Sequence, residues 1–599
     1  MNKTGAAQLS RRPLLPIVSW LRAYPRSDLR GDITAGAIVA ALAVPQSLGY
    51  AAIAGVPVQV GLYAVPTALL AYAVFGTSRQ LVVGPVSTVS VLSGSMVASL
   101  EPGDEAQAVA YTVALALGSG IVLIGVGLLR VGWVAEFLSK PIVTGFVWGL
   151  TILVIVGEIP KMIGVPVPDE DVLGRIGALL SGFLVAWDFL TVGISVMCLL
   201  VLFGLGRRMP RVPWALVLVV VATGLSMVLD WEGSGVAVVG EVPAGLPTPG
   251  LPGVDPARLG WIVVSGAALA LVGLAEGLSA ARLFANRGGY RIDADQELIA
   301  AGAANIASGV FGGLGVAGSL SKTAAAAEAN GRSQIAGVTT AALALVVIVA
   351  FAPALEALPL AVLSAIVVKA VWGLMDVDAF RRYRQVRRLD LVSAVAAAAG
   401  VLVLGPLQGL AAAILLSLLG LVYNASRVHL DVMGRISGEK AAWGSIADHP
   451  ERRAIPGIRV LRLDEPLFWV NAATFRDRAM ELVLQEGDVQ AVVLDLEGTG
   501  VLDTTSVDIL ADFVDGLHTM GIDVYLVRVR LPCRDLLRRS GVMDVIGEDH
   551  IWHSISQGVR QARRDHGITA ELRPTGPAAL KVPQSGEDEF GHRWTPFGS

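Results

Sequence analysis

The chain has 599 residues and a formal net charge of −4; 54% of its residues are apolar and only 16% are charged. Charged residues usually make up about a quarter of a soluble chain, so this composition excludes an ordinary soluble enzyme, a disordered protein and a single-span anchor. The charge gives no global basic field for nucleic acid. The two cysteines, Cys198 and Cys533, are too few for a disulfide framework or a four-cysteine zinc site.

The first 30 residues form a basic segment. They hold six Lys or Arg residues and no clean apolar stretch, which argues against a cleaved signal peptide. We therefore expect residues 1–30 to be a cytoplasmic N-terminal segment.

About fourteen apolar segments follow between residues 31 and 426. A membrane-spanning helix needs about 20 mostly apolar residues, although four of these pieces are shorter or rich in Gly. In chain order the segments cover residues 32–54, 58–76, 84–99, 107–130, 134–157, 176–206, 212–229, 259–284, 294–312, 318–330, 334–354, 357–375, 388–404 and 405–425. The sequence thus predicts an α-helical polytopic membrane protein with its transmembrane domain over residues 31–426.

Charges in the loops alternate between two sides. The basic loops precede segment 1 and follow segments 6, 8 and 12, so all of them fall on the side of the N-terminus. Acidic residues such as Glu101, Glu158 and Asp169 mark the opposite loops. Basic loops tend to be cytoplasmic. We therefore expect a multi-pass protein of the cell inner (plasma) membrane with both termini in the cytoplasm.

Interrupted segments recur at matching places in the two halves of the membrane part. Residues 43–51 correspond to 273–281 at an offset of 230, and residues 84–88 correspond to 318–322 at an offset of 234. The similar offsets predict two copies of a seven-segment unit, and because seven is odd the copies are inverted in the membrane. Such segments are the best sequence pointer to a transporter's binding site.

The second pair of matching segments predicts an anion site. Gly84 and Gly318 are interpreted as the starts of two short helices, with Pro85 at a first helical position, where it loses no hydrogen bond. Two helix N-termini that meet near the midplane direct unpaired N–H groups and positive dipole ends at one spot, which suits an anion. Hydroxyl donors could be added by Ser87, Thr88, Ser319 and Ser321.

Lys322 and Glu276 are ionisable residues inside the membrane part, where a charge is energetically unfavourable. A lysine at the bilayer centre costs roughly 2.5–3.5 kcal/mol on insertion scales, so Lys322 either adds its charge to the anion site or snorkels to the interface. Glu276 is either a proton-titrating, charge-balancing group beside that site or a structural partner of Lys322. Gln46 and Tyr50 share a helix face and could contact a ligand, although helix packing alone would also explain Tyr50.

The pattern changes period from about residue 456. Strand-like and helical patterns alternate from there, which predicts a small α/β domain over residues 456–565. Residues 427–455 are expected to be a linker, and the Pro- and Gly-containing residues 566–599 a disordered tail. The sequence has no phosphate-binding loop, metal-ligand spacing or nucleophile–base pair, so we expect no enzyme and no cofactor.

Several stretches carry a family signature. Residues 44–51 read Val-Pro-Gln-Ser-Leu-Gly-Tyr-Ala within a longer pattern over 32–64, residues 289–305 continue it, and residues 318–322 read Gly-Ser-Leu-Ser-Lys. These stretches resemble the sulfate permease family, also called SulP or solute carrier 26. The C-terminal domain is similar to the STAS domain appended to these carriers.

The resemblance implies fourteen transmembrane segments in two inverted seven-segment repeats, a moving core domain, a gate domain and a homodimer. It implies an anion site between the third and tenth segments, lined by the first and eighth. Glu276 matches the eighth-segment carboxylate, and Ala280 replaces a hydroxyl typical of sodium-coupled members, which disfavours sodium. Many members have Arg at Lys322; lysine keeps the charge but not the planar fork. The predicted substrate-binding residues are Gln46, Tyr50, Pro85, Val86, Ser87, Ser319, Leu320, Ser321 and Lys322.

The resulting hypothesis is a secondary active transporter of small inorganic anions, with sulfate as the first candidate, coupled to protons and working by elevator-type alternating access. Bicarbonate or C4-dicarboxylate transport, or anion exchange, are the alternatives within the family. An anion sensor that signals through the STAS domain is the alternative from a different class. The expected partners are a small anion, protons, the lipid bilayer and a second copy of the chain.

Overall fold

The computed structural model describes residues 15–574 with gaps. The gaps are residues 23, 131–138, 166–186, 210–211, 241, 243–244, 247, 437–441, 450–451, 486 and 570–572. The chain forms two compact units, Met1–Ser417 and Leu418–Ser599, and each is described by itself. The predictions for residues 1–14, for the acidic loop at 169–171 and for the tail beyond residue 574 lie outside the described residues.

Each of the fourteen predicted apolar segments overlaps a helix of the structure. Among the described residues, eight helices are long and apolar enough to cross a membrane. Two further helices, α1 (Pro16–Arg22) and α16 (Val377–Val386), were not predicted. The helices that match the segments are α2 (Leu29–Ile53), α3 (Val58–Phe75), α4 (Ser87–Ala98), α5 (Glu105–Leu128), α6 (Lys140–Ile163), α8 (Phe189–Leu200), α10 (Trp214–Leu229), α11 (Leu259–Arg287), α12 (Ala294–Val310), α13 (Leu320–Glu328), α14 (Ile335–Ala350), α15 (Leu360–Trp372), α17 (Arg388–Leu404) and α18 (Pro406–Ser426).

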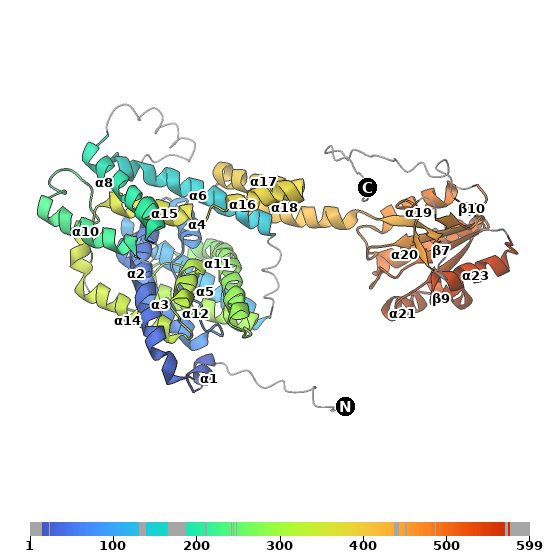
Figure 1. Cartoon of the computed structure of the whole chain (residues 1–599), viewed down its shortest axis with the longest axis horizontal. Coiled ribbons are helices and arrows are strands. Elements are labelled where there is room, and N and C mark those ends of the chain that lie inside the picture. Colours follow the sequence, from blue (N-terminus) through green and yellow to red (C-terminus); the bar gives the residue numbers. More distant parts are fainter. Residues whose placement is uncertain are drawn as a thin grey trace. The chain divides into compact units, whose positions relative to one another are not determined.

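The membrane helices lie close together in the first unit (Figure 1), and their contacts define two groups that meet where α15 packs against α2. In the first, which we call the core group, α3 contacts α2, α12 and α14, and α5 contacts α11 and α12. The short helices α4 and α13 also belong to the core group, since each contacts α2 and α11. In the second, the gate group, α6 contacts α15 and α17, and α15 contacts α8. Small residues permit the close approach within the core group: a Cβ atom added to Gly120 or to Gly302 would lie 2.7–2.8 Å from the backbone oxygen of the other. The grouping agrees with the core and gate that the resemblance implies.

Two short strands join the halves of the core group. β1 (Val83–Gly84) pairs antiparallel with β2 (Ala317–Gly318), with Val83 opposite Gly318 and Gly84 opposite Ala317. The expectation that Gly84 and Gly318 start helices is therefore wrong, since both lie in the strand pair. α4 begins only at Ser87, and Pro85 lies before the helix rather than at its first position. Extended backbone is favoured here because its N–H and C=O groups find partners across the pair.

Glu158 does not lie in an outer loop, as the charge pattern predicted. It lies in α6, which continues past Pro160 to Ile163. Its side chain is buried and accepts hydrogen bonds from Ser364 Oγ at 2.6 Å and from Lys161 Nζ at 3.0 Å. A buried carboxylate is tolerated when it is paired and hydrogen-bonded, and loop charge alone does not reveal such partners.

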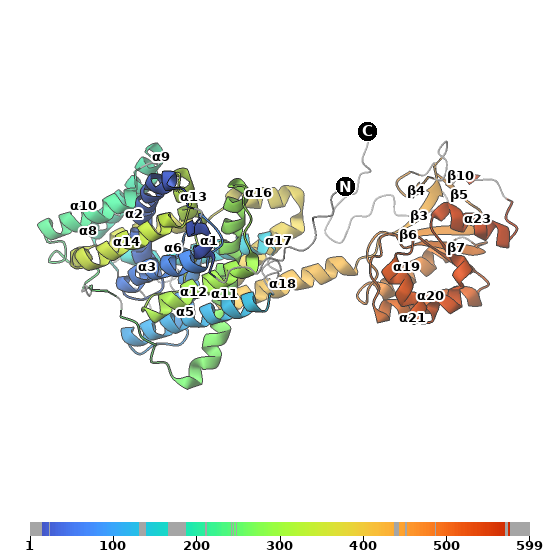
Figure 2. The same cartoon turned by 90° about the horizontal axis from the view of Figure 1, so that it is seen from below.

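The second unit is the predicted α/β domain (Figure 2). β6 (Ile458–Leu463), β7 (Ala491–Asp495), β8 (Asp523–Val527) and β9 (Ile551–Trp552) run parallel, and β6 also pairs antiparallel with β3 (Leu430–Arg435). α23 (Ile555–Asp565) packs on one face of the sheet. The other face is covered by α19 (Ala472–Leu484), α20 (Thr504–Thr519), α21 (Leu531–Arg539) and α22 (Val542–Ile546).

Residues 427–455, expected to be a linker, contribute strands to this sheet. β3 pairs with β6, with β4 (Trp443–Ser445) and with β5 (Arg453–Ala454). The β10 strand (Arg573–Pro574) pairs with β5 and lies in the region expected to be a disordered tail. These strands are short or only partly buried, so their hydrophobic alternation is weak.

Asp503 caps α20 and ties it to the loop before α19. Its carboxylate accepts hydrogen bonds from Ser506 N at 2.8 Å and from Trp469 N at 2.7 Å. Burial alone would raise the pKa of Asp503, but these hydrogen bonds favour the ionised form and hold the pKa below its usual value.

Replacing Asp503 by Ala should lower the free energy of unfolding of this unit by about 1 kcal/mol at pH 7. The folded pKa lies below the unfolded value of about 3.9, so the stabilisation is present in full above that pH and is lost as pH falls through the folded pKa. Urea denaturation of residues 427–574 at pH 7 and at pH 3 measures the effect. Asp508→Ala, at an exposed position of α20, is the control. If the loss of unfolding free energy in Asp503→Ala were the same at pH 7 and at pH 3, the expectation would be contradicted.

Candidate functional site

The strand pair brings the starts of two half-helices together. Ser319 N donates to Val82 O at 2.9 Å, and Val82 N donates to Thr323 Oγ1 at 3.0 Å. α4 and α13 therefore start beside each other from opposite halves of the chain. The predicted meeting of two helix N-termini is present in the structure, with their N–H groups and positive dipole ends near one another.

Lys322 is buried between the two half-helices. It is 2% exposed, which excludes the alternative that it snorkels to the interface. Its Nζ atom donates to the carbonyl oxygen of Pro85 at 2.5 Å and lies 5.4 Å from the ring centroid of Tyr50. A cation on the second half-helix thus reaches across to the residue that precedes the first one.

Glu276 approaches the same place from α11. The next residue, Gly277, packs against Gly318 of β2. The side chains of Thr88 and Tyr50 lie near the Glu276 carboxyl. Among the described residues no ion pair joins Glu276 to Lys322, so the structure does not contain the structural pair that was the alternative for Glu276.

The remaining predicted residues lie around these groups. Ser319 caps α13: its Oγ accepts from Lys322 N at 3.4 Å and lies 3.3 Å from Ser321 Oγ. Leu320 and Ser321 are exposed at the start of α13, whereas the residues directly before and after them are buried. This exposure leaves the first turn of the half-helix open to a ligand.

On the first half-helix the polar atoms are buried and partly unsatisfied. Val86 is the N-cap residue of α4 and Ser87 its first residue, and the Ser87 side chain interacts with Tyr50. Gln46 Oε1 and Thr88 Oγ1 are buried without a hydrogen-bond partner. Buried polar atoms in proteins are nearly always satisfied by protein, water or ligand, so these two atoms remain available to water or to a ligand.

A cavity of about 750 Å³ reaches the neighbourhood of Glu276. It lies between α6, α11 and α16, and Ala275 and Ser279, on either side of Glu276 in the sequence, line it. Charged residues of both signs surround it, namely Lys140, Arg282, Asp376, Asp378, Arg382 and Asp390. The cavity lies between the core group and the gate group on the side of the basic loops.

Two buried carboxylates of the core group were not predicted. Glu297 accepts hydrogen bonds from Tyr72 Oη at 2.5 Å, Thr77 N at 2.7 Å and Ser78 N at 2.9 Å. It thereby fixes the extended segment that leads into β1. The available signal was an acidic residue inside the apolar segment 294–312.

The second carboxylate, Asp32, holds the loop after α13. It accepts from Arg332 N at 2.6 Å, from Ser333 N at 3.1 Å and from Tyr24 Oη at 2.9 Å. Burial, followed by the hydrogen bond to Asp32, raises the pKa of Tyr24 to about 12, so the phenol remains a donor. Both half-helices are thus braced at positions remote from the candidate site.

The contact between Gly277 and Gly318 leaves no room for a side chain. A Cβ atom added to Gly318 would lie 2.8 Å from Gly277 Cα. Overpacking of this kind costs about 1–3 kcal/mol, so Gly318→Ala should displace β2 and reduce anion uptake by about fivefold or more. Radiolabelled anion uptake into proteoliposomes measures this. Gly125→Ala in α5, where nothing lies within 4 Å, is the matched control, and equal rates for both variants would contradict the packing argument.

Comparison with protein families covers both units. The model described as the sulfate permease family matches residues 29–397, and the model described as the STAS domain matches residues 449–559. A probable sulfate transporter of Mycobacterium tuberculosis is 36% identical over 92% of this chain and 98% of its own length. Sulfate transporter 1.3 of Arabidopsis thaliana is 26% identical over 93% of this chain and 88% of its own length.

Two solved structures share the fold. The murine Slc26a9 anion transporter in its inward-facing state matches with a TM-score of 0.86 at 22% identity, over 94% of this chain and 96% of that one. The transmembrane domain of the cyanobacterial bicarbonate transporter BicA matches with a TM-score of 0.58 at 25% identity, over 65% of this chain and 98% of that one.

Proposed function

The chain belongs to the sulfate permease family, and we therefore propose that it is a secondary active transporter of small inorganic anions, with sulfate as its first substrate. The family and the similar proteins are described as transporters and not as enzymes. One observation carries the proposal most: a buried lysine, Lys322, lies where two half-helix N-termini meet. A cation and unpaired N–H groups at one buried spot favour an oxyanion.

The proposed anion site uses groups from both half-helices. The exposed first turn of α13, with Leu320 and Ser321, offers backbone N–H groups and a hydroxyl. The buried, unpartnered Gln46 Oε1 marks an amide that can turn its NH₂ group toward an anion, since the two ends of the amide differ only by a rotation. Lys322 supplies the full positive charge, and Pro85 O, which now accepts from it, is the contact that loading would weaken or replace.

Proton coupling is proposed to act through Glu276. An ionised Glu276 near the site would repel a divalent anion, and a proton on its carboxyl would remove that repulsion. Anion and proton then favour each other's binding by the same factor, because coupling free energies are reciprocal. The position of Glu276 near Thr88 and Tyr50 supports this role, since those side chains belong to α4 and α2, which frame the proposed site.

Movement is proposed to follow an elevator mechanism. The site is built wholly from the core group, on α2, α4, α11 and α13, while the cavity of about 750 Å³ separates α11 from the gate group. A core that slides along the gate would carry the intact site between the two sides of the membrane. We further propose that the protein is a homodimer of the plasma membrane with cytoplasmic termini, on the resemblance and the basic loops.

Uptake of labelled sulfate into proteoliposomes, with and without an inward proton gradient, tests the proposal. Uptake that the gradient stimulates supports proton symport of sulfate. Absence of sulfate uptake under both conditions, with intact binding of another anion, would overturn the substrate assignment. Bicarbonate is the second candidate because of the likeness to BicA, and competition by bicarbonate or succinate in the same assay distinguishes the alternatives.

A further inference from the structure

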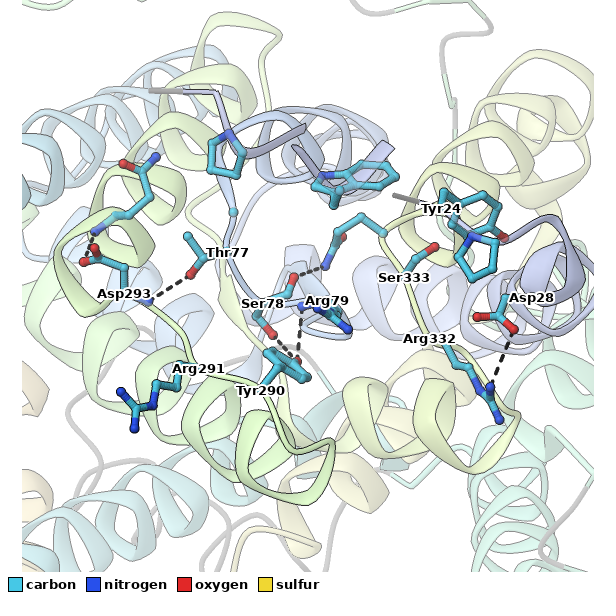
Figure 3. Close-up of a pocket in the computed structure, with 16 residues that line it drawn as sticks. Tyr24, Asp28, Thr77, Ser78, Arg79, Tyr290, Arg291, Asp293, Arg332 and Ser333 are labelled. Atoms are coloured by element: carbon cyan, nitrogen blue, oxygen red, sulfur yellow. Dashed lines mark hydrogen bonds and ion pairs between the residues drawn. The ribbon is translucent and has the colours of Figure 1, made fainter. Parts of the chain in front are cut away.

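A separate cavity of about 770 Å³ lies at one end of the core group, and none of the predicted substrate-binding residues lines it. Figure 3 shows its lining. Four segments meet there: α1 with the link to α2, the loop after α3, the loop before α12 and the loop before α14. The cavity falls in the size range of small-molecule sites, about 300–1,000 Å³.

One side of the cavity is basic. Arg79, Arg291 and Arg332, which we call the arginine edge, come from three different loops. In Figure 3, Arg291 lies at the lower left and Arg332 at the lower right, with Tyr290 and Arg79 between them. The guanidinium carbon of Arg79 lies 5.1 Å from the ring centroid of Tyr290, and Arg332 Nη1 lies 3.5 Å from Asp28 Oδ1. All three arginines are exposed, so their charges can meet a ligand at the mouth of the cavity.

The carboxylates around the cavity are already engaged. Asp293 accepts from Asp295 N at 3.1 Å and from Gln296 N at 3.3 Å as the cap of α12. Asp28 is paired with Arg332, and Asp32 and Glu297 are held by the hydrogen bonds described above. Within the part of the chain that the structure describes, Arg79 and Arg291 have no carboxylate partner, so the arginine edge retains positive charge for an anionic group.

The opposite side of the cavity is apolar and is formed by α1. Pro16, Trp20 and Pro25 line it, and Trp20 Nε1 donates to Ala73 O at 3.2 Å, which fixes α1 against α3. Leu15, Val18 and Leu21 around this helix are 42%, 43% and 54% exposed. Exposed apolar side chains and a Trp beside the first spanning helix are typical of a segment at the bilayer interface. α1 thus has the composition of a segment that lies at the level of the lipid headgroups.

We propose that this cavity binds the phosphate group of an anionic lipid. The phosphate would lie at the arginine edge, because planar guanidinium groups match phosphate oxygens bidentately, and the glycerol and upper acyl carbons would lie along α1. Soluble phosphate shares the headgroup chemistry, but it has no apolar part that would contact the wall formed by Trp20 and the two prolines. Because Asp32 and Glu297 fix the surrounding loops, little ordering free energy is lost on binding.

Thermal unfolding of the full chain in detergent tests the proposal. Added dioleoylphosphatidylglycerol should raise the Tm by several degrees more than dioleoylphosphatidylcholine does. The double variant Arg79→Gln/Arg291→Gln should lose at least half of that difference. The matched double variant Arg384→Gln/Arg388→Gln, at exposed arginines outside this cavity, should keep it.

Three further arms separate the explanations. Arg79→Lys/Arg291→Lys should respond between the wild type and the Gln variant, which distinguishes lost recognition from a failure to fold. Lys322→Ala should keep the full lipid response, which separates this cavity from the proposed anion site. Inorganic phosphate at the same concentration should give no shift. The proposal is overturned by equal lipid responses in both Gln variants, by no preference for phosphatidylglycerol in the wild type, or by a shift with phosphate alone.

Discussion

Lys322→Ala should weaken sulfate binding by roughly 10- to 150-fold, because a hydrogen bond to a charged group contributes about 1.5–3 kcal/mol. The substitution removes the only cation among the predicted binding residues and leaves Pro85 O without its donor. The half-helix N–H groups, with the hydroxyl and the amide of the proposed site, would then hold the anion without a cation. Isothermal titration of the purified protein with sulfate, together with uptake into proteoliposomes, measures the loss.

Lys322→Arg is the matched variant for this position. It keeps the positive charge and adds the planar fork that many members of the family have there, so it should bind sulfate within about tenfold of the wild type. The Tm of both variants without ligand checks that they are folded. An unchanged affinity in Lys322→Ala, with normal folding, would remove Lys322 from the anion site.

The second large effect is expected for Glu276→Gln. Glutamine has the shape of a protonated glutamate but cannot titrate, so the repulsion between this position and a divalent anion would be absent at every pH. Sulfate binding at neutral pH should therefore be as tight as in the wild type or tighter. The stimulation of uptake by an inward proton gradient, at most about tenfold per pH unit for one coupled proton, should disappear.

Uptake measured across a series of external pH values, with the internal pH held constant, tests this expectation. Glu105→Gln is the control, since Glu105 is an exposed acidic residue in the first turn of α5 and lies outside the site. If the pH profile of Glu276→Gln matches that of the wild type, Glu276 does not carry the coupled proton, and symport would need another group.

The architecture was predictable because the bilayer imposes a strong length and polarity rule. Each of the fourteen apolar segments coincides with a helix or its continuation, and the repeat offset correctly placed residues 84 and 318 opposite each other to within one residue, since Val83 pairs with Gly318. Glycine positions were less informative about local conformation. A glycine is compatible with the strand pair as well as with the helix starts that were expected. Only the hydrogen bonds between the two strands distinguish the two conformations.

Buried carboxylates were the main failure of the sequence analysis. Asp32, Glu158 and Glu297 lie near the ends of apolar segments, where a charged residue is ordinarily a loop residue. Their partners are backbone N–H groups and hydroxyls up to 301 residues away in sequence, as in Asp32 with Ser333. A single sequence does not show such contacts. The strands at 430–454 were missed for the related reason that each is stabilised by a partner strand: β3 pairs with β6, and β4 and β5 pair with β3.

The β1–β2 pair has a consequence for biogenesis. Its two strands are separated by 234 residues from Gly84 to Gly318, and translation at about 5–20 residues per second leaves roughly 10–50 s between their emergence. During that interval the backbone around Gly84 lies in a membrane without the partner that later satisfies it, and an unsatisfied backbone group in hydrocarbon costs several kcal/mol. The polar backbone groups around Gly84 must therefore be hydrated, or be covered by the insertion machinery or by neighbouring helices, until the second half has been inserted. A nascent chain truncated after α12 would lack β2 and should be a substrate for membrane quality control, whereas one that extends through α14 should not.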